Sequence, residues 1–124
     1  LAVEFAKKYN TIGFDINHNR VNELNSFKDS TNEVESEILS GVLKQNNEIG
    51  LTITIDEKNL DGCNVYIITV PTPIDNNKNP DLSPLINATK LVSQFLDKDN
   101  IVIYESTVYP GATEEECVPI LEKI

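Results

Sequence analysis

Four short runs of apolar and β-branched residues alternate with longer segments of helical periodicity along this chain. The runs are TIGFDI (11–16), LTITI (51–55), CNVYIITV (63–70) and NIVIYEST (100–107). Short runs that are apolar nearly throughout are typical of strands buried on both faces of a parallel sheet. Since parallel strands are joined by crossover helices, the alternation predicts an α/β fold, with a mainly parallel sheet and helices on both of its faces.

Helices are expected before, between and after these strands. Their predicted positions are residues 1–9, 18–27, 31–45 and 84–96, with a last helix that starts at Thr113. In the first helix, Leu1 and Phe5 form the expected inner face, together with Ala2 and Ala6. The expected capping residues are Asn17, then Thr31 or Asn32, then Ser83 with Pro84 behind it.

Length and charge limit the class of protein. A chain of 124 residues suits one domain with its own core, which we place at 1–124. The 10 Lys and Arg residues against 20 Asp and Glu give a formal charge of -10, which argues against a nucleic-acid partner, because binding phosphates needs cations. No apolar run approaches the roughly 20 residues that would span a bilayer, and no secretory pattern is present. We therefore expect no membrane partner and a cytoplasmic location.

Asp15 stands at the end of the first predicted strand, within GFDIN (13–17). In Rossmann-like, doubly wound folds an Asp or Glu at the end of the second strand binds the adenosine ribose hydroxyls, about 20 residues after a glycine-rich phosphate loop. On this interpretation the fold is truncated, its first strand and glycine loop precede Leu1, and the absence of Met fits a fragment. The alternative, a carboxylate that caps the next helix, is equally compatible with the pattern. Arg20 either flanks the adenosine or is a solvated charge on the helix surface.

Three longer motifs carry a resemblance to a known family. VPTPID (70–75), NPDLSPL (79–85) and YESTVYPGATEEECVPILE (104–122) resemble motifs of the nucleotide-sugar 6-dehydrogenases, which include UDP-glucose and GDP-mannose dehydrogenases. The resemblance covers essentially the whole chain and is to the family's N-terminal NAD-binding domain. ESTVYPGATEEEC is most similar to the branch that oxidises UDP-N-acetylhexosamines, since the UDP-glucose branch usually has Lys where this chain has Glu105.

The resemblance implies roles for four residues, and Glu105 is a further candidate. Asp15 would bind the ribose hydroxyls of NAD, Arg20 the adenosine end, and Thr72 the cofactor where its strand stops. Thr107 would lie near the nicotinamide and help to hold the catalytic water or the C6 oxygen. Glu105 would either contact a water or substrate near C6 or be a strand-end carboxylate paired with a neighbouring base or backbone N–H. The hydroxyls of Thr72 and Thr107 have an alternative role, which is to bond a nearby loop backbone group.

The resemblance also implies what the whole protein does. It would be a homo-oligomer that uses NAD for two hydride transfers from C6 of a UDP-sugar substrate, in surface or capsular polysaccharide synthesis. NAD is favoured over NADP because Asp15 would repel a 2′-phosphate. The nucleophilic cysteine and the sugar site would lie outside this chain, so we expect the isolated chain to be inactive and to bind NAD weakly or not at all. GlcNAc, GalNAc and ManNAc all stay open as the sugar.

The remaining residues of interest are interpreted as structural. Cys63 and Cys117 offer neither a disulfide framework nor metal spacing, His18 falls at a surface helix start, and no metal site is expected. Two rival functions stay open. One is a non-enzymatic α/β nucleotide-binding or regulatory module, and the other is a Rossmann dehydrogenase of another substrate class.

Overall fold

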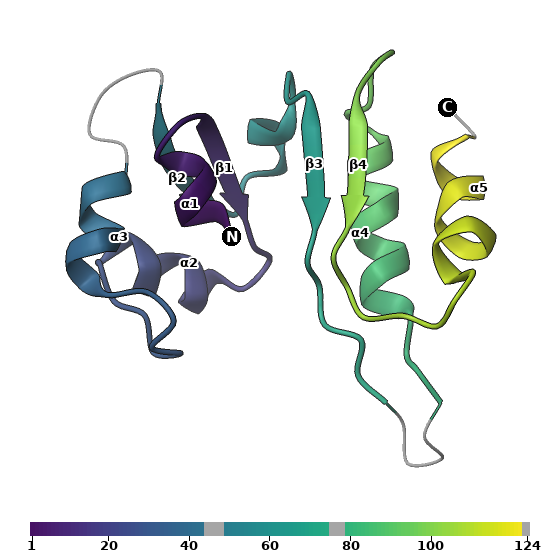
Figure 1. The fold of residues 1–124 in the computed structure, drawn as a ribbon, viewed down its shortest axis with the longest axis horizontal. Coiled ribbons are helices and arrows are strands. Elements are labelled where there is room, and N and C mark those ends of the chain that lie inside the picture. The colour runs from purple at the N-terminus through teal and green to yellow at the C-terminus, as the bar shows by residue number, and fades with distance from the viewer. Residues whose placement is uncertain (44–48, 75–78, 123–124) are drawn as a thin grey trace. The chain divides into compact units, whose positions relative to one another are not determined.

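The computed structural model describes residues 1–43, 49–74 and 79–122 (Figure 1). The chain divides into two compact units, Leu1–Leu60 and Asp61–Ile124. Within the described ranges, none of the helices has both the length and the apolar character needed to cross a membrane. The single domain over 1–124 stays a prediction.

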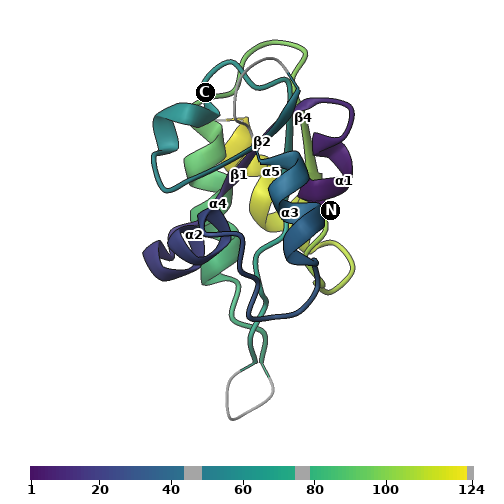
Figure 2. The same cartoon turned by 90° about the vertical axis from the view of Figure 1, so that its left-hand side faces the viewer.

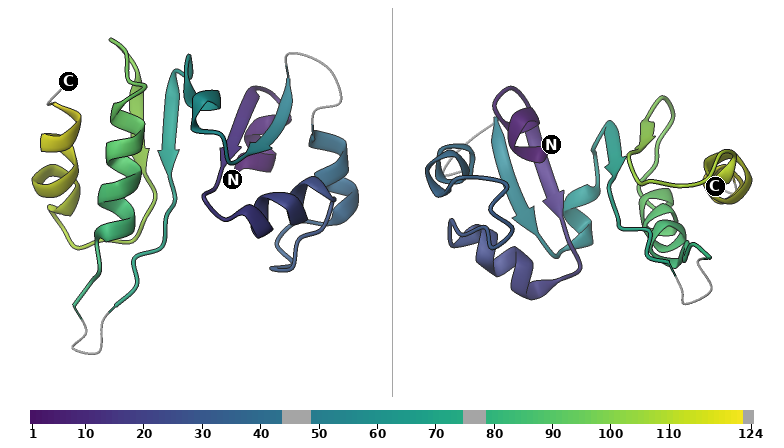
Figure 3. Two further views of the ribbon diagram at one scale, coloured as in Figure 1. Left: turned by 180° about the vertical axis from the view of Figure 1, so that it is seen from behind. Right: turned by 60° about the horizontal axis from the view of Figure 1, so that its bottom comes forward.

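The first unit is built around a pair of parallel strands. Its elements are α1 (Ala2–Ala6), β1 (Asn10–Phe14), α2 (His18–Asn25), α3 (Ser36–Val42), β2 (Gly50–Thr54) and the 3-10 helix η1 (Glu57–Leu60). β1 and β2 run parallel, with Asn10 opposite Gly50 and Phe14 opposite Thr54. α1 and α3 pack together beside this strand pair, as Figures 1 and 3 show.

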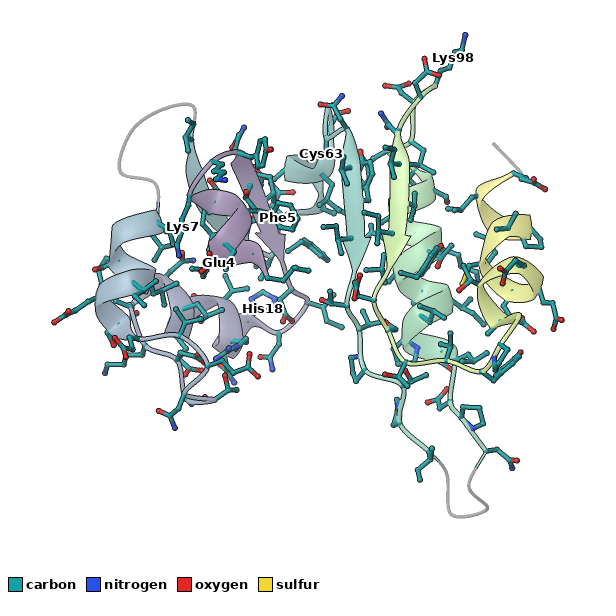
Figure 4. The ribbon with its side chains drawn as sticks, viewed as in Figure 1. Glu4, Phe5, Lys7, His18, Cys63 and Lys98 are labelled. Carbon is teal, nitrogen blue, oxygen red and sulfur yellow. The ribbon has the colours of Figure 1, made fainter. Side chains whose placement is uncertain are left out.

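The core of the first unit joins α1, α3 and β2. Ala6, Leu39 and Leu51 are at most 2% exposed and pack against one another. Of the expected inner face of the first helix, Ala6 is confirmed, whereas Leu1 and Phe5 are wrong, because they are 65% and 40% exposed. The small Ala6 side chain faces Leu39 instead, and it lets α1 approach α3 closely. Figure 4 shows Phe5 on α1 together with the surface ion pair of Glu4 and Lys7.

The ends of α2 and α3 depend on side chains that bond the backbone. Asn17 is confirmed as the cap of α2, since its side chain accepts the N–H groups of Asn19 and Arg20. Thr31 and Asn32 are not the caps of α3, which begins only at Ser36. The residues before Ser36 form a turn around the carboxylate of Asp29, and this turn replaces the first part of the predicted helix. The last part of the predicted helix, 44–45, lies outside the described residues.

The second unit repeats the plan with another parallel pair. Its elements are β3 (Val65–Ile68), α4 (Ser83–Ser93), β4 (Ile101–Tyr104), the π-helical segment η2 (Thr113–Cys117) and α5 (Val118–Leu121). β3 pairs with β4 in parallel, with Val65 opposite Ile101. Figure 1 shows α4 behind β4, and Figure 3 shows it in front from the reverse side. Among the described residues, the four strands form two separate two-stranded sheets.

One face of the β3–β4 pair is buried and the other is not. Tyr66 and Ile68 are each 5% exposed on the side of α4, whose Leu85 is fully buried. Ile101 and Ile103 on the opposite face are 55% and 37% exposed. Both units thus consist of parallel strands packed with helices, as the α/β prediction requires.

The start of α4 differs by one position from the prediction. Ser83 is the first helical residue and not the cap, while Pro84 lies in the first turn as expected. The carboxylate of Asp81 accepts the N–H of Ser83 at 2.9 Å, which satisfies a donor that the helix leaves unpaired. The Ser83 side chain first, and then its backbone N–H, lower the pKa of Asp81 below its usual value.

Candidate functional site

Asp15 follows β1 directly and is exposed. Its N–H donates to Thr54 O at 3.2 Å, which extends the strand ladder by one bond. Its carboxylate Oδ1 accepts the N–H of Asn17 at 2.8 Å. The helix cap is Asn17 and not Asp15, so the capping alternative for Asp15 is wrong. Oδ2 has no hydrogen-bond partner among the described residues, and it is available to a ligand hydroxyl.

Arg20 lies one turn into α2 and is held by neighbouring carboxylates. Its Nη1 is 2.8 Å from Asp29 Oδ1 and 3.6 Å from Glu23 Oε2. Asp29 first, with Glu23, raises the pKa of Arg20 above its usual value. The side chain is only 24% exposed, so Arg20 is not the freely solvated surface charge of the alternative interpretation. Its contact with adenosine stays a prediction.

The carboxyl ends of β3 and β4 meet at one edge of their sheet, because the two strands are parallel. Thr72 Oγ1 donates to the carbonyl of Thr107 at 2.7 Å, and Ser106 Oγ donates to the carbonyl of Val70 at 2.7 Å. The N–H of Glu105 donates to Ile68 O at 2.9 Å. The structure therefore brings together Thr72 and Thr107, which the sequence placed at two strand ends.

The two threonines differ in what their hydroxyls can still do. The Thr72 hydroxyl donates its proton to a loop carbonyl, which is the alternative role predicted for it, and only its lone pairs remain for a ligand. The Thr107 hydroxyl and the Glu105 carboxylate are exposed and bond no described residue. Thr107 thus keeps both a donor and acceptors, which is what orienting a water requires.

The thiols and the histidine lie away from these strand ends in the chain. Cys117 is fully buried in η2, and burial followed by Asp61 raises the pKa of Cys63. Figure 4 shows His18 where α2 begins and Cys63 ahead of β3. In the part of the chain that the structure describes, no group of three or more His, Cys, Asp or Glu is placed to hold a metal ion.

Sequence reasoning missed two residues that shape these sites, Asp29 and Ser106. Asp29 begins DST, a pattern in which an Asp often bonds the backbone two residues on. Ser106 stands between two predicted site residues, but a serine pattern does not say which carbonyl its hydroxyl will bond.

The family pattern described as "UDP-glucose/GDP-mannose dehydrogenase family, NAD binding domain" matches residues 1–124. The chain belongs to this family. The resemblance in the strand-end motifs is thereby confirmed, and NAD is the cofactor of the domain that this chain matches.

Relatives within the UDP-glucose/GDP-mannose dehydrogenase family support a narrower likeness. The chain is 54% identical to UDP-N-acetyl-D-glucosamine 6-dehydrogenase of Pseudomonas aeruginosa, over 99% of this chain and 28% of the relative. It is 48% identical to the enzyme of the same name from Salmonella typhi, over 100% of this chain and 28% of the relative. The chain thus spans little more than a quarter of the length of these relatives.

Solved structures confirm the Rossmann-like, doubly wound class. The structure of UDP-D-ManNAc dehydrogenase from Pyrococcus horikoshii matches with a TM-score of 0.82 at 32% identity, over 98% of this chain and 28% of that one. UDP-N-acetyl-mannosamine dehydrogenase Cap5O from Staphylococcus aureus matches with a TM-score of 0.80 at 27% identity, over 99% of this chain and 29% of that one.

The residues present fit parts of NAD. The free oxygen of Asp15 suits a ribose diol, because an ionised carboxylate accepts hydrogen bonds and the diol donates them. The hydroxyl rim of Thr72 and Thr107 suits the carboxamide group of the nicotinamide, which offers both a donor and an acceptor, at the end of a parallel strand pair.

Proposed function

We propose that the protein carrying this chain is an NAD-dependent 6-dehydrogenase of UDP-N-acetylhexosamines. It would convert the C6 alcohol of the sugar to a carboxylate, for surface or capsular polysaccharide synthesis. A cytoplasmic location and a homo-oligomeric whole protein belong to the same proposal. The observation that carries it is the 54% identity over 99% of this chain to a protein named UDP-N-acetyl-D-glucosamine 6-dehydrogenase.

The overall change requires two oxidations. The C6 alcohol first loses a hydride and a proton to become an aldehyde, which adds a cysteine thiol from another part of the protein. The thiohemiacetal loses a second hydride and a proton to become a thioester, and water releases the carboxylate and the thiol. NAD, when bound, accepts each hydride.

Within this chain, the site residues would bind NAD and orient water or the substrate. Asp15 would hold the ribose hydroxyls through its free carboxylate oxygen. Thr72 fixes the loop after β4 by donating to the carbonyl of Thr107, which leaves the Thr107 hydroxyl to orient water or the C6 oxygen. Glu105 would contact a water or the substrate near C6.

The test uses the full-length protein that contains this chain. Incubation with NAD and, separately, UDP-GlcNAc, UDP-GalNAc and UDP-ManNAc should give two NADH for each sugar oxidised, with a uronate as the product in mass spectrometry. UDP-glucose is the matched control and should react more slowly. Turnover of UDP-glucose alone would contradict the proposed substrate class, and the absence of NADH with every sugar would contradict the dehydrogenase.

Thr107 and Thr72 offer a finer test of the strand-end roles. Thr107→Val should lower kcat by roughly tenfold or more, because a water-orienting hydrogen bond is lost. Thr72→Val should raise KM for NAD more than it lowers kcat, because it loosens the loop. Equal and small effects of both substitutions would contradict the assignment.

A further inference from the structure

The connection from α2 to α3, which faces the viewer in Figure 2, surrounds one buried carboxylate. The Asp29 side chain is 1% exposed. Its Oδ1 accepts the N–H of Thr31 at 3.1 Å and the Thr31 hydroxyl at 2.6 Å. Its Oδ2 accepts the N–H groups of Glu33 at 3.0 Å and Val34 at 2.9 Å. A carboxylate this well solvated by the protein has a fixed position and a fixed charge.

Asp29 and Glu23 together enclose the guanidinium of Arg20. Nη1 of Arg20 is buried and lies 2.8 Å from Asp29 Oδ1, close but poorly aligned for a hydrogen bond, so charge holds the pair together. Glu23 Oε2 lies 3.6 Å from the same nitrogen, while its Oε1 accepts the N–H of Ser30. Arg20 Nη2 donates to the Thr31 hydroxyl at 3.4 Å. Two carboxylates against one cation leave this cluster with a formal charge of about -1.

The cluster is tied to the turn that carries Asp15. Asp15 Oδ1 accepts the N–H of Asn17, and Asn17 Oδ1 accepts the N–H of Arg20 at 3.2 Å. Asp15 and the Arg20 backbone are therefore linked through a single residue. Where the end of the second strand takes an NADP, an Arg nearby accommodates the 2′-phosphate. Arg20 has the position for this role, but its charge is already compensated.

We propose that Asp29, assisted by Glu23, is a specificity-determining residue that makes the domain select NAD over NADP. By holding and neutralising Arg20, Asp29 withholds the cation that would otherwise attract a 2′-phosphate beside Asp15. Arg20 is held through its edge, and a guanidinium held in this way keeps its planar faces for stacking on a base. The inference rests on the proposed function, in which Asp15 binds the adenosine ribose.

The charge of Asp29 persists at neutral pH. The hydroxyl of Thr31, then Arg20 and the backbone N–H groups of Val34 and Thr31, hold the pKa of Asp29 far below its usual value. Ser30 first, and then Arg20, lower the pKa of Glu23 as well. Both carboxylates therefore stay ionised under the conditions in which the cofactor would bind.

The test compares NAD and NADP in the full-length protein. The variants are Asp29→Asn, the milder Glu23→Gln, and each of these combined with Arg20→Met. Calorimetry gives the Kd for each cofactor, and kinetics give kcat and KM. The quantity compared between variants is the ratio of the Kd for NAD to the Kd for NADP. Asp29→Asn should shift the ratio of the two Kd values toward NADP by roughly tenfold to a hundredfold, the size of one hydrogen bond to a charged group. Glu23→Gln should shift it less, in the same direction.

The double variants distinguish an effect of the freed Arg20 cation from a general loss of structure at the site. Arg20→Met should abolish the shift in both backgrounds, because the released cation is then absent. A purely structural role for Asp29 would weaken both cofactors alike and leave the ratio unchanged. Should Asp29→Asn fail to fold by circular dichroism, Glu23→Gln with and without Arg20→Met carries the same comparison.

Two failures have different meanings. A wild-type protein that does not bind NAD contradicts the proposed function and this inference with it. If the wild-type protein binds NAD, two results contradict the inference alone. In one, neither folded variant changes the ratio of the two Kd values. In the other, the ratio still changes when Arg20 is replaced by Met.

Discussion

The turn after β1 and the ends of β3 and β4 hold their polar groups in different ways. After β1, ionised side chains hold one another, since Arg20 Nη1 lies 2.8 Å from an oxygen of Asp29 and 3.6 Å from an oxygen of Glu23. At the ends of β3 and β4, the neutral hydroxyls of Thr72 and Ser106 donate to main-chain carbonyls instead. The first arrangement responds to pH and salt, because its members carry charge, whereas the second does not.

The same contrast holds for the buried polar side chains of the two units. The first unit buries the Asp29 carboxylate at 1% exposure, whereas the second buries the hydroxyl of Thr89 at 0%. Thr89 Oγ1 donates to Leu85 O at 2.8 Å and lies 3.0 Å from the Tyr104 hydroxyl, which must then be the donor of that second bond. Each unit thus buries a polar side chain with defined partners, charged in Asp29 and neutral in Thr89.

The largest expected effect comes from Asp29→Ala. It removes four hydrogen bonds from one turn and leaves the cation of Arg20 without its nearest partner. The urea midpoint of the first unit should fall, and hydrogen exchange of β1 and β2 amides should speed up, while β3 and β4 amides change little. Asp15→Ala is the matched control, since Asp15 is exposed and accepts one backbone bond, and its effect should be several times smaller. Equal effects of the two substitutions would show that Asp29 does not stabilise the first unit more than an exposed carboxylate does.

Opposite pH limits for the two units are the next largest effect. The folded pKa of Asp29 lies below its ordinary value of 3.8, so its contribution is present above pH 3.8 and is lost as the pH falls further. Burial raises the pKa of Tyr104 from 10.0 to about 12, so its contribution is present below pH 10.0 and is lost as the pH rises toward 12. Hydrogen exchange resolved by strand should show β1–β2 opening first in acid and β3–β4 first in alkali.

Asp29→Asn and Tyr104→Phe test these limits separately. The first should flatten the acid response of β1–β2, and the second should flatten the alkaline response of β3–β4. A single pH limit shared by both strand pairs in both variants would show that other groups control the titration.

Thr89→Val should have a moderate effect on the second unit. Val has nearly the shape of Thr, so the loss is that of a buried hydroxyl whose absence removes the Thr89 acceptor from Tyr104. We expect a loss of about 1–3 kcal/mol in the free energy of unfolding, measured with urea. Ser93→Ala is the control on the same helix, because among the described residues its hydroxyl bonds Lys90 O alone, and it should cost less than about 0.5 kcal/mol. Adding Tyr104→Phe to Thr89→Val should recover part of the loss; a further full loss would mean that the two hydroxyls do not act as a pair.

Strands and strand-end residues could be predicted because they depend on local pattern and simple topology. The four apolar runs became β1 to β4, and Thr72 and Thr107 met because parallel strands end on the same edge. Asn17 was found as a cap because a cap bonds the residues next to it.

Features that depend on distant packing could not be predicted in this way. Leu1 and Phe5 have the spacing of an inner face, but the approach of Leu39 selected Ala6 instead. Asp29 matters because Arg20, nine positions away in the chain, turns toward it, and no spacing rule gives that contact. The start of α3 moved for the same reason, since the Asp29 carboxylate takes the N–H groups of Glu33 and Val34.

The smallest expected effect concerns the end of α2. The N–H of Lys28 donates to Glu23 O at 3.1 Å and that of Phe27 donates to Leu24 O at 3.0 Å, which is a Schellman ending with a left-handed residue that is usually glycine. Phe27 occupies that position at φ 61° and is 42% exposed. Phe27→Gly should relieve a cost of roughly 1–2 kcal/mol and lose backbone entropy worth about half of that, so the first unit should gain less than about 1 kcal/mol.

The second unit supplies the counterpart of this substitution. Gly111 already holds a left-handed position at φ 92°, and an added Cβ would lie 3.0 Å from Glu115 Oε1. Gly111→Ala should therefore cost the second unit roughly 1–2 kcal/mol, whereas Phe27→Gly stabilises the first. Phe27→Ala separates backbone from side chain, because it keeps the Cβ and loses only the ring, and it should stabilise nothing. If Phe27→Ala stabilised the first unit as much as Phe27→Gly, the gain would come from removing an exposed ring and not from the left-handed backbone.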